Sequence, residues 1–272
     1  MELSKLTQKR IQEYLREGRR FDGRKPIEFR DVTIETDVVK NADGSARVKF
    51  GDTEVMVGVK MDVGEPYPDS EDSGTLITTA ELLPLSSSRF EPGPPGIEAI
   101  EIARIVDRGI RESGFIDFKK LCIKKGEKVW NVLIDIYSMN DDGNLIDASA
   151  IGAIAALKTA RMPKYDEKEE RIAYGEWTTK KVPLTEILPL TVTFYKIGKE
   201  VLIDPSAEEA ESSQARLSLT LSKGEDKKLR INAVQKGGEE PFDEEEIGRI
   251  LDTAEKVYND YAAKIEKNLK LD

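Results

Sequence analysis

The sequence contains no histidine and only one cysteine among its 272 residues. Without histidine, a serine-type catalytic triad, a histidine-ligated zinc ion and histidine acid–base catalysis are excluded. The lone Cys122 cannot form an internal disulfide, and its apolar context favours a small buried hydrophobe in a reducing, cytoplasmic protein. No apolar run reaches the roughly 20 residues of a membrane span, and no signal-peptide core is present. We therefore expect no membrane partner.

Charge is abundant but unbalanced. Charged residues make up 35% of the chain, hydrophobic residues 39%, and the formal net charge is −10. This composition predicts a soluble globular protein with a highly charged surface. A free-standing nucleic-acid-binding protein is usually basic, so any RNA contact must be local or shared with a partner.

The segment from residue 121 to 163 predicts the centre of the fold. Residues 129–137 are β-branched and apolar, as in a buried strand, and residues 141–144 supply turn chemistry. From Asp147 the chain is rich in alanine and almost free of polar side chains, which predicts a buried helix lying close to a sheet. We expect this helix to form the core.

The flanking segments suggest two halves. Residues 1–20 predict an amphipathic helix, whose apolar stripe could cover either its own chain or a neighbouring subunit. Residues 21–163 begin with a β-meander and form the first half, and residues 183–262 form the second. The charged segment 164–182 is interpreted as a linker, and residues 263–272 as a charged tail that frays. The predicted fold class is α/β (α+β), two-layer, with two similar βα halves.

Three stretches carry a family resemblance. They are RRFDGRKPIEFRDVTIETDVVKNADGSARVKFGDTEVMVGVK, LCIKKGEKVWNVLIDIYSMNDDGNLIDASAIGAIAAL and PSAEEAESSQARLSLTLS. In this order they resemble the RNase PH family, and within it the non-catalytic RNase PH-like subunits of the archaeal exosome. The DGR of the first stretch, taken alone, is a turn. The resemblance implies an RNase PH domain, related to the ribosomal protein S5 domain 2-like arrangement.

The helix expected at residues 97–113 bears the candidate RNA-binding residues. Arg104, Arg108 and Arg111 share a narrow arc, and a guanidinium suits bidentate phosphate contact. Glu101 and Glu112 lie at salt-bridging spacing, so the residues alone favour an ordinary exposed ion-paired face. The resemblance reverses this preference, because corresponding arginines in exosome rings line the RNA path; Arg104 and Arg108 match best. Arg89, in the preceding loop, could face the same pore.

The same resemblance implies that this chain lacks the catalytic residues of active family members at two positions. Active family members carry a Gly-Gly-Thr-Arg type loop that binds phosphate, whereas this chain has Asp141 and Asp142 at the turn and Leu145 in place of the Arg. Two carboxylates repel a phosphate dianion. The pair of aspartates expected before the alternating strand is replaced by Glu209 and Ala215.

An acidic loop follows the second-half strands. Asp204, Glu208 and Glu211, with Glu209, could form a differently built Mg²⁺ site, although a solvated acidic loop is the favoured interpretation.

Three functions remain open on the sequence. The first is a non-catalytic exosome subunit, without a cofactor, that pairs with a catalytic RNase PH-like paralogue. The resemblance implies a hexameric ring (a trimer of heterodimers), cap proteins with S1 or KH domains, and single-stranded RNA as the ligand. The second is an autonomous phosphorolytic or Mg²⁺-dependent 3′-exoribonuclease. The third is an unrelated α/β interaction protein with no RNA role.

Overall fold

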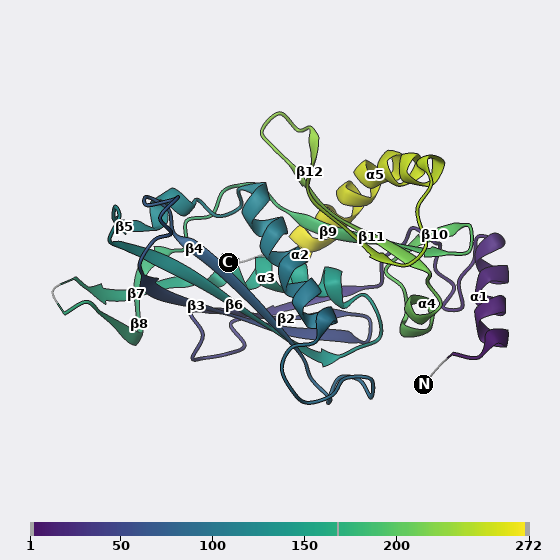
Figure 1. Ribbon diagram of the computed structural model, residues 1–272, viewed down its shortest axis with the longest axis horizontal. Coiled ribbons are helices and arrows are strands. Elements are labelled where there is room, and N and C mark those ends of the chain that lie inside the picture. Colours follow the sequence, from purple (N-terminus) through teal and green to yellow (C-terminus); the bar gives the residue numbers. More distant parts are fainter. Residues whose placement is uncertain (1–2, 168, 270–272) are drawn as a thin grey trace.

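The computed structural model describes residues 3–167 and 169–269, which fold into two main sheets with helices between and outside them (Figure 1). The helices are α1 (Lys5–Arg16), α2 (Ile97–Ser113), α3 (Leu145–Thr159), α4 (Ala207–Glu211) and α5 (Glu244–Asn268), with a 3₁₀ turn η1 at Phe118–Leu121. Within the described ranges, no helix combines the length and the hydropathy needed to cross a membrane.

The first sheet has six strands in the order β1-β2-β3-β6-β4, with β5 paired to one end of β6. They are β1 (Val32–Thr36), β2 (Gly44–Phe50), β3 (Thr53–Gly64), β4 (Thr75–Leu82), β5 (Cys122–Lys124) and β6 (Lys128–Asn140). The pairs β1–β2, β2–β3 and β3–β6 are antiparallel, which confirms the predicted meander, whereas β4 runs parallel to β6.

The second sheet is antiparallel and has the strand order β10-β9-β11-β12. Its strands are β9 (Leu190–Ile197), β10 (Glu200–Ile203), β11 (Ala215–Lys223) and β12 (Leu229–Gly238). Along β11 the predicted alternation places the leucines on one face and Ser218, Thr220 and Ser222 on the other. Strand β12 is an edge of this sheet, and most of its residues are exposed.

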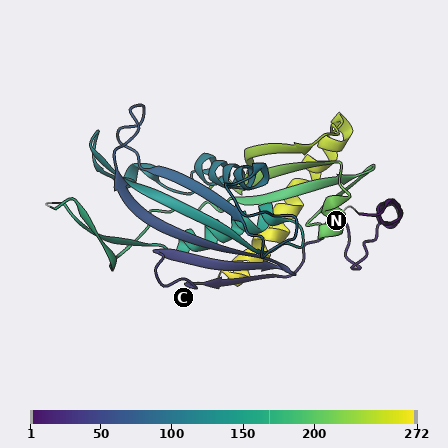
Figure 2. The ribbon, with the colours of Figure 1, turned by 60° about the horizontal axis from the view of Figure 1, so that its bottom comes forward.

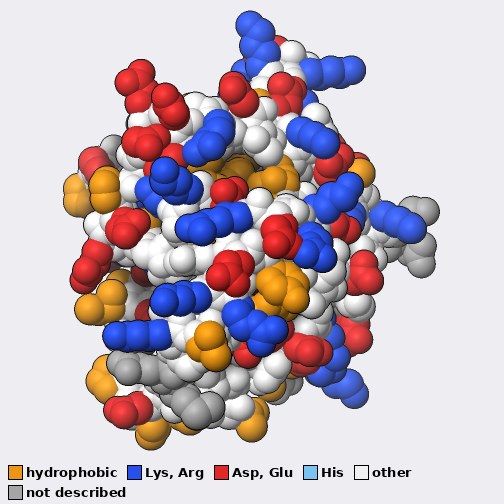
Figure 3. All heavy atoms as spheres, turned by 90° about the vertical axis from the view of Figure 1, so that its right-hand side faces the viewer, with side chains coloured by type: hydrophobic (Ala, Val, Ile, Leu, Met, Phe, Trp, Pro, Cys, Tyr) orange, Lys and Arg blue, Asp and Glu red, His pale blue; other side chains and the backbone are white. Residues whose placement is uncertain are grey.

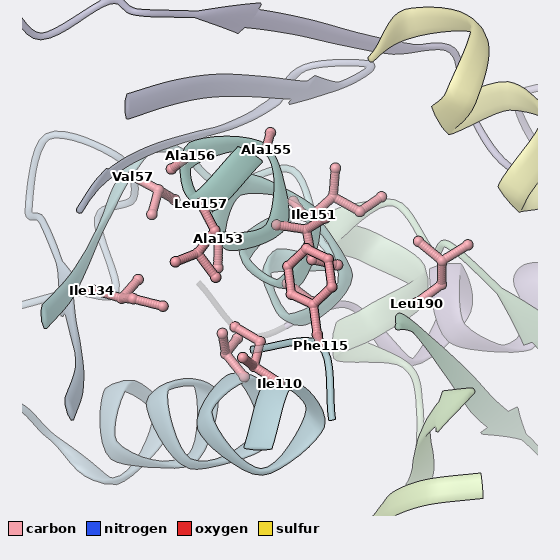
Figure 4. Packing of buried hydrophobic residues seen from close by; sticks show 14 of the residues in the cluster. Val57, Ile110, Phe115, Ile134, Ile151, Ala153, Ala155, Ala156, Leu157 and Leu190 are labelled. Atoms are coloured by element: carbon pink, nitrogen blue, oxygen red, sulfur yellow. The ribbon is translucent and has the colours of Figure 1, made fainter. Parts of the chain in front are cut away.

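Helix α3 forms the centre of the molecule, as the sequence predicts. It contacts β2 and β3 of the first sheet, β9 of the second, and α2, and only Lys158 among its residues is not buried. Figure 4 shows Ile151 of this helix beside Phe115 and Leu190, at the junction of the two halves. A Cβ added at Gly152 would lie 2.6 Å from Val57 Cγ2, so the small residue permits the close approach of helix and sheet.

The fold class is therefore confirmed, but the two halves are not separate layers. Helices α2 and α3 come from the first half and contact strands of both sheets, whereas α5 contacts β9 and β1. One continuous hydrophobic core includes residues from both halves. Helices α2 and α3 of the first half thus cover one face of the second sheet.

The segment 164–182, predicted as a linker, lies between the two halves but forms regular strands for most of its length. Strands β7 (Arg161–Asp166) and β8 (Arg171–Lys181) form an antiparallel hairpin, which projects at one end of the molecule in Figures 1 and 2. Buried Ile172 and the Trp177 indole, which donates to Asp43 Oδ1 at 2.8 Å, anchor the hairpin to the first half. These anchors are tertiary contacts, which the charged local sequence does not reveal.

The predicted frayed tail is also wrong for residues 263–269. Helix α5 continues to Asn268, because Ile265 and Leu269 extend the buried stripe of Val257 and Tyr261. Residues 270–272 of the predicted tail lie outside the described residues.

The predicted N-terminal helix is observed as α1, at the opposite end of the molecule from the hairpin (Figure 1). Its Ile11 and Leu15 are buried against Tyr195, Ile197 and Leu202 of the second sheet. The apolar stripe therefore covers its own chain there, while Leu6 is 68% exposed. Residues 1–2 of the predicted segment lie outside the described residues.

Candidate nucleic-acid interface

Helix α2 presents one exposed face that changes character along its length. The helix ends at Gly114, whose φ of 70° closes it in a left-handed C-cap. Its buried side faces the core, and its other side carries residues three or four positions apart, so that their side chains align. These aligned and exposed residues are Ile97, Ile100, Arg104 and Arg108. An apolar half of the face therefore leads into a cationic half.

Arg104 and Arg108 line one wall of a groove of about 470 Å³ between α2 and the strands β11 and β12. The Arg104 guanidinium has no ion pair or hydrogen bond to any other described residue. Arg108 reaches Glu112 at 3.4 Å, but both side chains are about half exposed or more, and such pairs contribute little. The structure thus brings together two cations that remain available for an anionic ligand.

Arg111 does not share this groove. Its guanidinium donates to both carboxylate oxygens of Asp107 and, at 2.9 Å, to the carbonyl oxygen of Leu76, and it lies over the Phe118 ring. These contacts tie α2 to β4. The third arginine of the predicted stripe therefore has a structural environment that differs from that of Arg104 and Arg108.

The turn between β6 and α3 is filled by the protein's own ion pairs. Arg30 donates to the Asp142 carboxylate at 3.0 Å and to the Gly143 carbonyl at 3.2 Å. Thr53 Oγ1 donates to the same carbonyl at 2.6 Å, and Asn144 closes the turn in the left-handed region with φ of 61°. The backbone N–H groups of Asp142 and Gly143 donate to Thr53 Oγ1 and Asp141 Oδ1, each at 3.1 Å, so the amides that could bind a phosphate are engaged in internal contacts.

Asp204 is the hub of these contacts. Its side chain is fully buried and accepts hydrogen bonds from Arg30, from Arg24 and, at 2.9 Å, from Asn144 Nδ2. Burial by itself would raise the pKa of Asp204, but the hydrogen bonds and charge of Arg30, with the charge of Arg24, lower it below its ordinary value. The carboxylate is therefore held ionised and neutralised by two arginines from the first half.

The acidic segment predicted as a loop is partly a helix and partly buried. Ser206 caps α4 in a capping box with Glu209. The Glu209 carboxylate is buried and pairs with Arg20, which also donates to the carbonyl oxygens of Ile203 and Asp204. The described residues contain no cluster of three acidic, cysteine or histidine side chains that could hold a metal ion. The interpretation of this segment as a solvated acidic loop is wrong at Asp204 and Glu209, because arginines compensate both charges internally.

Arg89 also has an internal partner. It donates to Asp141 at 2.8 Å and lies over the Phe90 ring, and its side chain is about half exposed. With Asp141, Leu145 and Arg216 it lines a smaller cavity of about 180 Å³ beside the turn. Arg216 is paired with Glu101, so neither guanidinium at this cavity is unpaired.

Asp147 is a buried acid that the sequence gives no reason to single out. The backbone N–H and the hydroxyl of Thr193 donate to its carboxyl group at 3.1 and 2.7 Å, linking α3 to β9. Burial raises the pKa of Asp147 to about 7, although the bonds from Thr193 oppose this shift.

The arginines that neutralise the turn and α4 are also not found by sequence reasoning. Arg20, Arg24 and Arg30 lie more than a hundred residues from their acidic partners. The DGR motif that contains Arg24 gave the only signal, and it indicated a turn.

Comparison with known proteins places both halves in one family. The model of the 3′ exoribonuclease family, domain 1, matches residues 28–163. The model of domain 2 of the same family matches residues 188–257. Both sheets and the groove between α2 and β12 therefore lie within family domains.

Individual relatives match over nearly the whole chain. The exosome complex component Rrp42 of Methanocella arvoryzae is 45% identical over 250 residues, which cover 92% of each chain. A solved Archaeoglobus fulgidus exosome with RNA bound to the active site contains a chain of 43% identity and TM-score 0.82, covering 94% of this chain and 98% of that one. A chain of a solved archaeal exosome core matches with 41% identity and TM-score 0.82, covering 96% of both. The chain belongs to the 3′ exoribonuclease family of RNase PH proteins.

Proposed function

We propose that this chain is a non-catalytic component of an archaeal exosome, which pairs with a catalytic RNase PH-like paralogue and contributes RNA binding to a composite active site. Its own residues would hold RNA through Arg104 and Arg108, while the paralogue would supply phosphate binding and bond cleavage. RNA that lies across both subunits would then be positioned by one and cut by the other.

The observation that carries this proposal is the contrast between two sites on the chain. At the turn before α3, Arg30 engages the carboxylate and backbone where active members bind phosphate, and the buried Leu145 takes the place of their arginine. At the groove beside β12, Arg104 and Arg108 stay exposed. A phosphorolytic site needs a free phosphate cradle, whereas RNA binding needs accessible cations. The chain satisfies only the second requirement.

The exposed face of α2 supports a protein partner next to the arginines. Ile97 is 86% exposed and Ile100 is 50% exposed, one turn or more before Arg104. Large apolar side chains grouped on one helix face are typical of a subunit contact. A neighbour that covers the isoleucines would bring its own site beside the guanidiniums, as a composite site requires.

We further propose an alternating ring of three copies of each subunit, capped by proteins with S1 or KH domains, in the reducing setting of the cytoplasm. Phosphate recognition in such a ring needs only local positive charge, so a net charge of −10 is no obstacle. On the face that carries α1, Figure 3 shows Lys and Arg interspersed with Asp and Glu. Mixed charge of this kind agrees with binding that is confined to a groove.

The test measures release of nucleoside diphosphates from poly(A) RNA in the presence of inorganic phosphate and Mg²⁺. We expect no release by this chain alone and processive release when the catalytic paralogue is added. Robust release by the chain alone would reject the proposal in favour of an autonomous 3′-exoribonuclease.

A second arm tests the assigned residues. Charge reversal of both arginines, Arg104→Glu with Arg108→Glu, is expected to abolish RNA binding by this subunit in the ring. The matched control is Arg230→Glu, an exposed arginine whose one ion pair among the described residues is with Asp226 on the turn after β11. Unchanged RNA affinity in the double variant would remove the site assignment and support an interaction protein with no RNA role.

A further inference from the structure

The groove beside α2 has two chemically different walls. Arg104 and Arg108 form one wall, and Asn232 and Gln235 of the edge strand β12 belong to the other. Helix α2 lies close to strand β11 at the floor of the groove because Gly109 has no Cβ: one added there would lie 2.8 Å from Thr220 Oγ1. The volume of about 470 Å³ lies within the range of roughly 300–1,000 Å³ that small-ligand sites occupy.

The floor of the groove is polar but internally satisfied. Ser218 is paired with Gln235 and Thr220 with Ala233 in the β11–β12 register, so these side chains share the face toward α2. The hydroxyls of Ser218 and Thr220 each lie 2.9 Å from a threonine hydroxyl of β9. These floor hydroxyls are therefore already hydrogen-bonded within the second sheet.

The wall formed by β12 retains two acceptors. Asn232 Nδ2 donates to Ser222 Oγ at 2.8 Å, which orients the amide and leaves Oδ1 without a partner among the described residues. Gln235 Nε2 donates to Glu101 Oε1 at 3.4 Å and to the Lys236 carbonyl at 3.3 Å, and its Oε1 accepts from no described donor. Two amide oxygens therefore lie across the groove from two guanidiniums.

The chemistry of the walls indicates which part of a nucleotide fits. No aromatic residue lines the groove, so its described part offers no stacking platform for a base. The guanidiniums suit phosphate oxygens. Free amide oxygens require a donor, and the only hydrogen-bond donor along a sugar–phosphate backbone is the ribose 2′-hydroxyl, which DNA lacks.

We propose that this groove distinguishes RNA from DNA: Asn232 Oδ1 and Gln235 Oε1 accept from ribose 2′-hydroxyls while Arg104 and Arg108 hold the adjoining phosphates. The inference rests on the proposed RNA-binding role of the arginines and adds to it a source of sugar selectivity. Since bases are not contacted, the groove confers little sequence preference.

The test compares oligo(A) RNA with oligo(dA) of equal length, bound to the ring assembled with the catalytic paralogue, in buffer without inorganic phosphate. Fluorescence anisotropy gives both dissociation constants, and the paralogue's own preference cancels when each variant's RNA-to-DNA ratio is compared with that of the wild type. The variants are Asn232→Ala, Gln235→Ala and their combination, with the exposed Asn41→Ala as the matched amide control.

The expected result is a loss of RNA affinity of about fivefold for each amide, with DNA affinity unchanged. Gln235→Ala removes no buried contact, so it tests the proposal even where Asn232→Ala lowers stability. An unchanged RNA-to-DNA ratio in the double variant, or an equal loss for both nucleic acids, would overturn the inference. The double variant Arg104→Ala with Arg108→Ala tests the proposed function separately. The proposed RNA-binding role fails only if this double variant also leaves RNA affinity unchanged.

Discussion

Replacing Asp204 by alanine should destabilise the protein more than any exposed ion-pair substitution. The side chain is fully buried, and the guanidiniums of Arg24 and Arg30 both depend on it. Arg30 could retain Asp142, but Arg24 would keep, as its acidic partner among the described residues, only the partly exposed Asp22. Removing one partner of a buried ion pair typically costs about 3–5 kcal/mol, because the remaining charge is left buried and uncompensated.

This loss translates into a measurable melting shift. For a chain of this size, about 1 kcal/mol corresponds to roughly 2–4 °C, so Asp204→Ala should lower the melting temperature by roughly 6–20 °C. Differential scanning calorimetry and urea titration followed by circular dichroism measure the change. The matched control is Asp226→Ala, whose carboxylate pairs with exposed Arg230 and which should cost less than about 1 kcal/mol.

The pH dependence of the difference gives an independent check. The folded-state pKa of Asp204 is lowered, so its stabilisation is fully present above the unfolded-state value of 3.8 and is lost as pH falls through the folded-state pKa. The wild type and Asp204→Ala should therefore differ most near neutral pH and converge in strong acid. A loss at neutral pH no larger than that of Asp226→Ala would refute the role of Asp204 as the charge hub that joins the two halves.

Three further variants test other parts of the structure. Arg104→Ala with Arg108→Ala should weaken RNA binding by the ring at least about tenfold. It should also reduce the slope of log affinity against log salt by roughly 1.4, because each single-strand phosphate contact contributes about 0.7, and an unchanged slope in the salt titration would contradict phosphate contact. Arg111→Ala should lower the melting temperature, because the contacts to Asp107 and Leu76 are lost, and should leave the RNA affinity measured by anisotropy unchanged. A loss of RNA affinity without a loss of stability would instead identify Arg111 as an RNA-binding residue. The pKa of Asp147 is raised to about 7, so the free energy of unfolding of the wild type should fall as pH rises from about 4 to about 7. Asp147→Asn should flatten this pH dependence, and a variant profile that matches the wild type would exclude Asp147 as the source of the dependence.

Periodicity and turn chemistry were sufficient for the central elements. The alternation along β11, the apolar run of β6 and the alanine-rich α3 each have local patterns that only one type of element satisfies, and all three were predicted correctly. The bounds of the arginine helix were also predicted correctly, because prolines precede it and Gly114 ends it. The family prediction, which rested on three motifs in order, is confirmed by both domain models.

Other segments acquire their structure from distant contacts. The β7–β8 hairpin was predicted as a linker because its local sequence is charged, and Trp177 and Ile172 stabilise it through packing on the first half. The end of α5 was predicted as a frayed tail, yet Ile265 is buried. In both cases a few apolar residues among many charged ones stabilise the element, because they are buried against a distant part of the chain. Their contribution therefore depends on tertiary packing and not on local propensity.

The amino-acid sequence was enough to identify the family, the order of the main elements and the absence of histidine chemistry, and through the family resemblance it predicted two positions where catalytic residues are missing. The family resemblance, not the residue pattern alone, predicted Arg104 and Arg108 as RNA-binding residues, and this assignment stays a prediction. The folded structure alone shows that Arg111 donates to the Leu76 carbonyl on β4, that Asp204 and Glu209 are buried and neutralised, and that Asn232 and Gln235 lie across the groove from the arginines. The reason is that a charge's partner is set by proximity in space, and ion pairs that span more than a hundred residues have no local pattern in the chain.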